Sequence, residues 1–139
     1  MNKHYLKWGD IQELVDILCK KISISNLDIK DLWGLPRGGS IPTVMISHKL
    51  GIPITKGTIS PTTLIIDDIC DSGKTFKEYF NYYQTQFAFP FNLKTACLNY
   101  KPQTSSFIPT LWANQWSSKD WIVYPWEMED SKTIQDYKI

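Results

Sequence analysis

Apolar residues recur along the chain with two different spacings, which predict helices alternating with strands. Between Gly9 and Ile22, apolar residues lie three and four positions apart, the spacing of an amphipathic helix. An aspartate near the start of this segment and two lysines near its end suit the helix dipole. The first predicted element is therefore a helix over Gly9–Ile22.

Three short apolar runs predict strands, and the segments between them predict two further helices. Runs of apolar and β-branched residues that stop at Gly, Pro or Asp are typical of buried strands. The predicted strands are Asp31–Leu35, Thr63–Ile66 and Lys94–Tyr100, and the predicted helices are Ile41–Leu50 and Thr75–Gln86. This alternation favours an α/β fold, a mostly parallel central sheet flanked by helices on both faces. The length of 139 residues predicts a single domain, 1–139.

Smaller signals set the expected boundaries around the second helix. Ser40 is expected to be its N-cap, and Gly51 stands just past its end, where glycine is favoured. The next residues, Ile52–Thr55, predict a short edge strand, because Pro53 lacks the N–H that a central strand needs.

Composition and charge exclude several classes of function. Fifteen Lys and Arg against fourteen Asp and Glu give a net charge of +1, far from the basic excess of nucleic-acid-binding domains. No apolar run approaches the roughly 20 residues of a membrane helix, and the start lacks the apolar stretch of a signal peptide. The cysteines Cys19, Cys70 and Cys97 form no C-x-x-C pair, and we expect buried thiols in a reducing, cytoplasmic compartment.

The segment "LIIDDICDSGKTF", Leu64–Phe76, ends like a nucleotide-binding P-loop but lacks the beginning of one. A P-loop, G-x-x-x-x-G-K-[ST], needs a glycine five positions before Gly73, and Asp68 stands there instead. A carboxylate at that place would repel a triphosphate. The pattern therefore excludes a P-loop and leaves another kind of phosphate site.

The same residues suit a phosphorylated ribose. The strand would deliver Asp67 and Asp68 to the carboxyl edge of the sheet, where ligands of open α/β sheets bind. Two carboxylates suit ribose hydroxyls or a hydrated Mg²⁺. The turn Asp71–Thr75 offers backbone N–H groups, hydroxyls and a helix N-terminus, which suit a phosphate monoester.

This segment resembles the phosphoribosyl pyrophosphate signature of the type I phosphoribosyltransferases: apolar strand, two acids, then Asp, Ser or Thr, Gly, any residue and Thr. The resemblance implies a catalytic site of Asp71, Asp67 and Asp68, with Asp67 and Asp68 also holding Mg²⁺. Asp71 would manage the N7 proton of a purine. The phosphate would bind the loop Asp71, Ser72, Gly73, Lys74 and Thr75. The side chain of Lys74, at the variable position, is expected to face solvent.

A second segment, "GLPRGGSIP", resembles the pyrophosphate-binding loop of the bacterial xanthine-guanine enzymes of this family. Arg37 offers a forked cation, and Gly38 and Gly39 let backbone N–H groups approach an anion closely. In that family the peptide bond before the arginine is often cis, which here is the bond between Pro36 and Arg37.

The C-terminal "DWIVYPWE" resembles the base-binding segment of the same enzymes, which forms a small hood over the site. The resemblance assigns purine stacking to Trp121 and main-chain contact with the base to Ile122. It also assigns the lysine that contacts the 6-oxo group to Lys101 of "LNYKPQ". Stacking discriminates poorly between bases, so Lys101 and the main chain would provide the selectivity.

Together these segments predict transfer of a phosphoribosyl group from phosphoribosyl pyrophosphate to guanine, xanthine or hypoxanthine in purine salvage. Relatives are usually dimers or tetramers, so a homo-oligomer is expected. Two alternatives stay open: a non-catalytic sensor of phosphoribosyl pyrophosphate or nucleotides, and an enzyme for a non-purine base. The sensor alternative is motivated by the short segment Lys56–Thr63, which stands where the family has a flexible lid over the reacting ribose. The family's lid often has twenty or more residues, whereas these eight residues reach at most about 14 Å.

Overall fold

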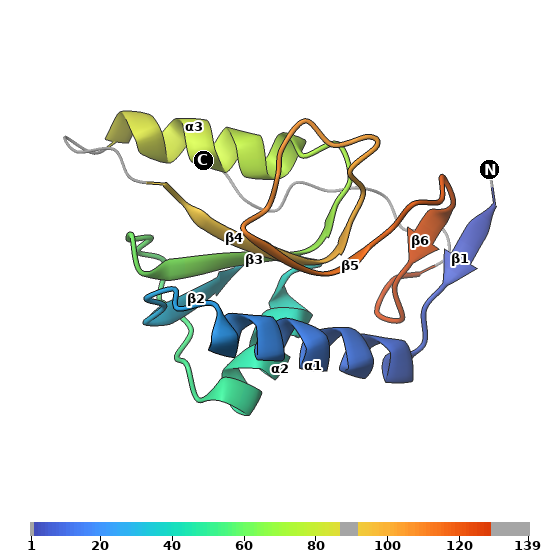
Figure 1. Ribbon diagram of the computed structural model, residues 1–139, viewed down its shortest axis with the longest axis horizontal. Helices are drawn as coiled ribbons and strands as arrows, with labels where there is room; N and C mark the ends of the chain where they lie inside the picture. The colour runs from blue at the N-terminus through green and yellow to red at the C-terminus, as the bar shows by residue number, and fades with distance from the viewer. Residues whose placement is uncertain (1, 87–91, 129–139) are drawn as a thin grey trace.

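Four parallel strands form the central sheet of the computed structural model, which describes residues 2–86 and 92–128 (Figure 1). In spatial order the strands are β2 (Asp31–Gly34), β3 (Thr63–Cys70), β4 (Lys94–Tyr100) and β5 (Leu111–Gln115). Each strand pairs with its neighbour in parallel, so all carboxyl ends meet at one edge of the sheet. The predicted parallel sheet is thereby confirmed.

Helices cover both faces of this sheet, as the alternation of elements predicts. The helices α1 (Trp8–Ile24) and α2 (Ser40–Leu50) lie together on one face, and α3 (Lys74–Gln86) lies on the other (Figure 1). Successive side chains of a strand point to opposite faces, so a strand covered on both sides must be apolar at consecutive positions. This explains the unbroken run Leu64–Ile66.

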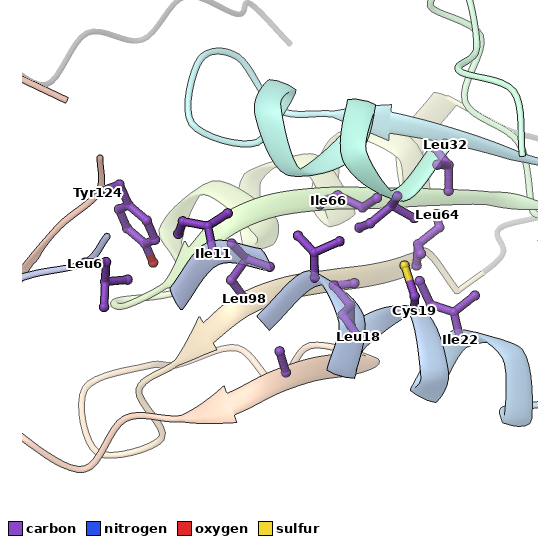
Figure 2. Close-up of a cluster of buried hydrophobic side chains, with 14 of the residues drawn as sticks. Leu6, Ile11, Leu18, Cys19, Ile22, Leu32, Leu64, Ile66, Leu98 and Tyr124 are labelled. Carbon is purple, nitrogen blue, oxygen red and sulfur yellow. The ribbon is translucent and has the colours of Figure 1, made fainter. Parts of the chain in front are cut away.

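The core accordingly consists of two clusters, one on each side of the sheet. Figure 2 shows the first, in which side chains of α1 lie against those of the central strands. Its fully buried members include Ile11, Leu18, Leu32, Leu64, Ile66 and Leu98. The second cluster lies under α3 and includes Ile65, Phe76, Tyr79 and Cys97. Both clusters pack the strands from either side, and the site residues lie at or near the carboxyl ends of those strands.

A second, two-stranded sheet joins the two ends of the described chain. Strand β1 (Lys3–Tyr5) pairs in parallel with β6 (Trp121–Val123), which carries the predicted base-binding residues. We call this small sheet the hood. The pairing of β1 with β6 was not predicted, because a three-residue exposed strand carries too little periodicity to be recognised.

Several element boundaries differ from the prediction. Ser40 is the first helical residue of α2 rather than its N-cap, which is Gly39. Strand β3 continues past Ile66 to Cys70, so the two acidic residues lie within the strand rather than after it. The predicted edge strand is reduced to one bridge between Ile54 and Leu32. Pairing with neighbouring backbone, which one segment's sequence does not contain, decides where strands end.

The shortened lid segment is anchored to the core instead of projecting from it. Ile59 is buried in the cluster under α3. The segment returns to the sheet through Thr63, whose Oγ1 donates a 2.6 Å hydrogen bond to Asp31 Oδ1. These contacts lie at the amino end of β3, whereas the acidic residues lie near its carboxyl end.

All three cysteines are buried and form no disulfide, as predicted. Burial raises the pKa of each thiol above its ordinary value. Among the described residues, no helix combines the length and apolar character needed to cross a membrane.

Candidate active site

The acidic pair lies near the carboxyl end of β3, close to the middle of the sheet. Asp67 Oδ1 accepts a 2.9 Å hydrogen bond from the backbone N–H of Asp68. Burial raises the pKa of Asp67 well above its usual range, and the neighbouring Asp68 carboxylate raises it further. Burial also raises the pKa of Asp68, from 3.8 to about 6. The pair therefore holds protons to a higher pH than isolated aspartates do and favours a bound cation.

Glu127 belongs to this acidic group, although the sequence analysis did not single it out. Its charge contributes to the raised pKa of Asp68. Its Oε1 accepts a 2.8 Å hydrogen bond from the backbone N–H of Tyr124, which fixes its place beside the hood. The signal available in the sequence was an acid directly after the Tyr-Pro-Trp run, but nothing local indicates that it faces Asp68.

Replacing Asp68 with Asn is expected to stabilise the protein at neutral pH. Because the pKa of Asp68 is raised in the folded state, the folded protein binds more protons than the unfolded chain between about pH 4 and 6, and stability falls as pH rises through that window. Asn carries no charge to bury. Urea unfolding without Mg²⁺ should show a gain of about 1 to 3 kcal/mol near pH 7.5 that disappears near pH 4.

The exposed Asp28 provides the matched control. Asp28→Asn should change the free energy of unfolding by less than about 0.5 kcal/mol at either pH. A gain for Asp68→Asn that is the same at both pH values would contradict a buried-charge origin.

The predicted pyrophosphate loop packs directly against the acidic pair. A Cβ atom at Gly38 would lie 2.3 Å from Asp68 Oδ2, and one at Gly39 would lie 2.3 Å from the carbonyl oxygen of Ile66. Only glycine permits these approaches. The peptide bond between Pro36 and Arg37 is cis, as the resemblance implies. The Arg37 loop and the two carboxylates therefore lie in one site.

The predicted phosphate loop lines a pocket at the start of α3. The pocket has a volume of about 140 Å³, and its lining residues include Asp67 and Asp71–Thr75. Gly73 has φ of +82°, and a Cβ there would lie 2.6 Å from Phe107 Cβ. Both the backbone conformation and the lack of space therefore require glycine. The backbone N–H of Lys74 donates to Ser72 Oγ at 3.2 Å. Backbone N–H groups at a helix N-terminus suit an anion.

The side chain of Lys74 is exposed to solvent and extends along α3. Its side chain is 72% exposed, and its Nζ lies 3.9 Å from Glu78 Oε1, one helical turn further along α3. The prediction that Lys74 faces solvent is confirmed. Its backbone, rather than its ammonium group, belongs to the phosphate loop.

Lys101, by contrast, is buried and faces the signature. Its Nζ lies 3.8 Å from Asp71 Oδ2 and donates a 3.1 Å hydrogen bond to the carbonyl oxygen of Asp120. Its own backbone N–H donates to the carbonyl of Cys70. Lys101 thus joins the signature to the residue just before β6, which brings together three segments far apart in sequence.

The two predicted base-binding residues of β6 face opposite ways. Trp121 is 50% exposed, which is unusual for a core tryptophan and leaves its ring accessible for stacking. Ile122 is buried in the main core, so the main-chain contact that the resemblance assigns to it stays a prediction. The N–H of Trp121 also donates a 2.8 Å hydrogen bond to the carbonyl of Asn2, the residue before β1, which helps to hold the strand.

Tyr124 connects the hood to the acidic pair, and the sequence analysis did not identify it. Its hydroxyl donates to the carbonyl of Asp68 at 3.0 Å and accepts a 3.1 Å hydrogen bond from Asn99 Nδ2. Burial and the nearby Asp68 charge raise the pKa of Tyr124 well above its ordinary value. Figure 2 shows this ring at the end of the core beside Leu6 and Ile11. The hydrogen bond from the Tyr124 hydroxyl therefore ties the end of β6 to the acidic pair.

Solved structures of other proteins resemble this arrangement over most of the chain. A purine phosphoribosyltransferase from Pyrococcus horikoshii Ot3 is 28% identical, with a TM-score of 0.77, covering 96% of this chain and 99% of that one. A xanthine-guanine-hypoxanthine phosphoribosyltransferase from Helicobacter pylori is 17% identical, with a TM-score of 0.71 and coverages of 91% and 94%. A hypothetical protein from Neisseria gonorrhoeae with bound ppGpp is 21% identical, with a TM-score of 0.75 and coverages of 93% and 91%. No family model and no curated protein matches the chain.

The parallel sheet, the signature at its carboxyl edge and the hood give this protein the fold of one class of enzymes, the type I phosphoribosyltransferases. Within that class it is similar to the purine phosphoribosyltransferases, among them the enzyme from Pyrococcus horikoshii Ot3.

Proposed function

We propose that the protein transfers the 5-phosphoribosyl group from phosphoribosyl pyrophosphate to a 6-oxopurine, which gives the nucleoside monophosphate and pyrophosphate. The observation that carries this proposal is Lys101. It is buried between Asp71 and the carbonyl of Asp120, the residue directly before the exposed Trp121 to which the resemblance assigns base stacking. A lysine donor matches the 6-oxo acceptor of guanine, xanthine and hypoxanthine.

The reaction develops positive charge on the ribose and negative charge on the departing pyrophosphate. Asp67 and Asp68 hold the ribose hydroxyls in this proposal, and their charge favours the cationic sugar. Arg37 and the backbone N–H groups of Gly38 and Gly39 receive the pyrophosphate as its negative charge grows. The Asp71–Thr75 loop holds the 5′-phosphate at the start of α3.

On the base side, Asp71 is the residue that handles the proton. Its Oδ2 faces Lys101, so a base seated against the lysine presents its N7 edge to the same carboxylate. Attack on C1 of the ribose makes the N7 or N9 proton acidic, and a carboxylate within hydrogen-bond reach accepts it. The main chain at Ile122 then contacts the 2-position of the purine.

The acidic pair fits a magnesium ion. Two adjacent carboxylates whose pKa values are raised by burial, and for Asp67 also by its neighbour's charge, gain from a bound dication. Among the described residues, no group of three or more His, Cys, Asp or Glu could hold a metal. Mg²⁺ takes one or two carboxylates and completes its shell with water and phosphate oxygens, so two carboxylates are enough to hold it. When bound, the ion would neutralise charge on the leaving pyrophosphate.

The test is a panel of bases incubated with the protein, Mg²⁺ and phosphoribosyl pyrophosphate, with the monophosphates separated by chromatography. The proposal expects product from at least one of guanine, xanthine and hypoxanthine. Product from uracil or orotate alone would favour the non-purine alternative. Binding of phosphoribosyl pyrophosphate in calorimetry, without product from any base, would favour a sensor.

The proposed setting is purine salvage in the cytoplasm. Three free, buried cysteines are typical of proteins in a reducing compartment. A homo-oligomer, as a dimer or tetramer, stays a prediction that light scattering of the purified protein measures directly.

A further inference from the structure

The segment that follows Lys101 turns back onto the signature and places a hydroxyl against the carboxylate of Asp71. Thr104 Oγ1 lies 2.7 Å from Asp71 Oδ1. It lies 3.1 Å from the carbonyl oxygen of Asp71 and 3.5 Å from that of Lys101. A hydroxyl has one hydrogen, and the shortest contact, to a carboxylate oxygen, is the strongest of the three.

The two carboxylate oxygens of Asp71 are therefore held from different sides. Oδ1 accepts from Thr104, whereas Oδ2 lies 3.8 Å from Lys101 Nζ. The side chain of Asp71 is 42% exposed, so packing covers only part of it and these two polar contacts add to what orients it. The hydroxyl and the ammonium group together restrict its rotation and keep Oδ2 on the side of the base.

The backbone around Thr104 is itself fixed. The N–H of Ser105 donates to the carbonyl of Lys101 at 3.0 Å. The N–H and Oγ of Ser106 both donate to the carbonyl of Ser72, at 2.8 and 3.1 Å. Thr104 thus sits on a short loop tied at one end to the base lysine and at the other to the phosphate loop. Its hydroxyl is positioned before any ligand binds, which is what an orienting group requires.

The geometry also suits both protonation states of Asp71. While the carboxylate is ionised, the hydroxyl donates to Oδ1. Once Asp71 has accepted a proton from the base, the hydroxyl can turn its hydrogen to the carbonyl of Asp71 and use its oxygen as an acceptor. A hydroxyl can do both, whereas a methyl group can do neither.

We propose that Thr104 is a positioning residue for the transfer reaction, which orients the Asp71 carboxylate toward the base through the hydrogen bond to Oδ1. The inference rests on the proposed function. The hydroxyl of Thr104 contacts Asp71 and the carbonyl of Lys101, so its effect is expected to pass through Asp71.

The experiment compares Thr104→Val, which keeps the shape and removes the hydroxyl, with Thr104→Ser, which keeps the hydroxyl. Thr104 is exposed, so Val is tolerated by the fold. With a 6-oxopurine as acceptor, Thr104→Val should lower kcat by about 10-fold, the effect of one hydrogen bond to a charged group. Its KM for phosphoribosyl pyrophosphate should stay within about twofold of wild type, and Thr104→Ser should restore at least half of kcat.

A double-mutant cycle tests whether the effect passes through Asp71. In an Asp71→Asn background, adding Thr104→Val should lower kcat no further, because the carboxylate that it orients is gone. Thr85→Val is the matched control. Thr85 also donates a hydrogen bond to a carbonyl, that of Tyr82, near the far end of α3, and its replacement should leave kcat unchanged.

Three results would overturn the inference while leaving the proposed function intact. These are an unchanged kcat for Thr104→Val, an equal loss in the Asp71→Asn background, and a loss expressed in the KM for phosphoribosyl pyrophosphate alone. The last would mean that Thr104 only braces the phosphate loop. A wild-type protein that makes no nucleotide from any 6-oxopurine would instead overturn the proposed function, and this inference with it.

Discussion

Asp71→Ala is expected to lower kcat by about 10²- to 10⁴-fold, the range for loss of a general acid or base. The carboxylate faces Lys101 on one side and Thr104 on the other, and in the proposed reaction it accepts the proton of the base. Alanine leaves the backbone of the phosphate loop in place, and the side chain is partly exposed, so the fold should tolerate the change. Steady-state formation of the nucleoside monophosphate measures the effect.

Lys74→Ala is the matched variant from the same loop. Its side chain is 72% exposed and pairs only weakly with Glu78, so turnover should stay nearly intact. This pair of variants tests the central distinction between this loop and a P-loop, in which the lysine side chain holds the phosphates. A large loss for Lys74→Ala with little for Asp71→Ala would reverse the assignment of the whole loop.

Lys101→Met is expected to lower kcat/KM for the purine by about 100-fold. Methionine has an unbranched side chain of similar length, so it fills the same buried space without the ammonium group. The base then loses a charged hydrogen-bond donor, and the carbonyl of Asp120 and the Asp71 carboxylate lose their shared partner. Loss of a hydrogen bond to a charged group is worth about 1.5 to 3 kcal/mol, which is about 10- to 160-fold. Kinetics with varied purine concentration, at saturating phosphoribosyl pyrophosphate, measure the loss.

Lys77→Met provides the control, because this lysine lies exposed on α3 outside the pocket lining. Its kcat/KM should match that of the wild type. Calorimetry should find that Lys101→Met still binds phosphoribosyl pyrophosphate with near-normal affinity, since the phosphate loop and the acidic pair are untouched. An equal loss of binding for both substrates would indicate that Lys101 supports the fold rather than the base.

The local signals in the sequence were strong where one element carries its own pattern. The helix α1 and the strand β4 follow from periodicity, because each buries one or two faces that the residues themselves mark, whereas β1, β5 and β6 were not predicted. The exposure of Lys74 also followed from the variable place it holds in the signature. Errors fell at boundaries such as Ser40, where a change of one residue depends on the backbone of the preceding loop.

The sequence could not predict contacts that join distant segments. Glu127 beside Asp68, Tyr124 donating to the carbonyl of Asp68, and the pairing of β1 with β6 each join residues tens of positions apart. None of these residues carries a local signature, because a glutamate or tyrosine near a chain end is ordinary until a partner is known. The raised pKa values of the acidic pair likewise arise from burial that only the assembled sheet creates.

The sequence by itself determined which groups the proposed chemistry can use: two adjacent carboxylates, a glycine turn that suits a phosphate, and an arginine loop that suits a second anion. These are short-range features, since chemistry of this kind depends on residue type and spacing along a few consecutive positions. The tertiary structure alone decided which groups face each other, including Lys101 against Asp71, Gly38 against Asp68 and Thr104 against Asp71. The physical reason is that parallel strands bring their carboxyl ends to one edge, and only packing of the loops above that edge sets distances of a few ångströms.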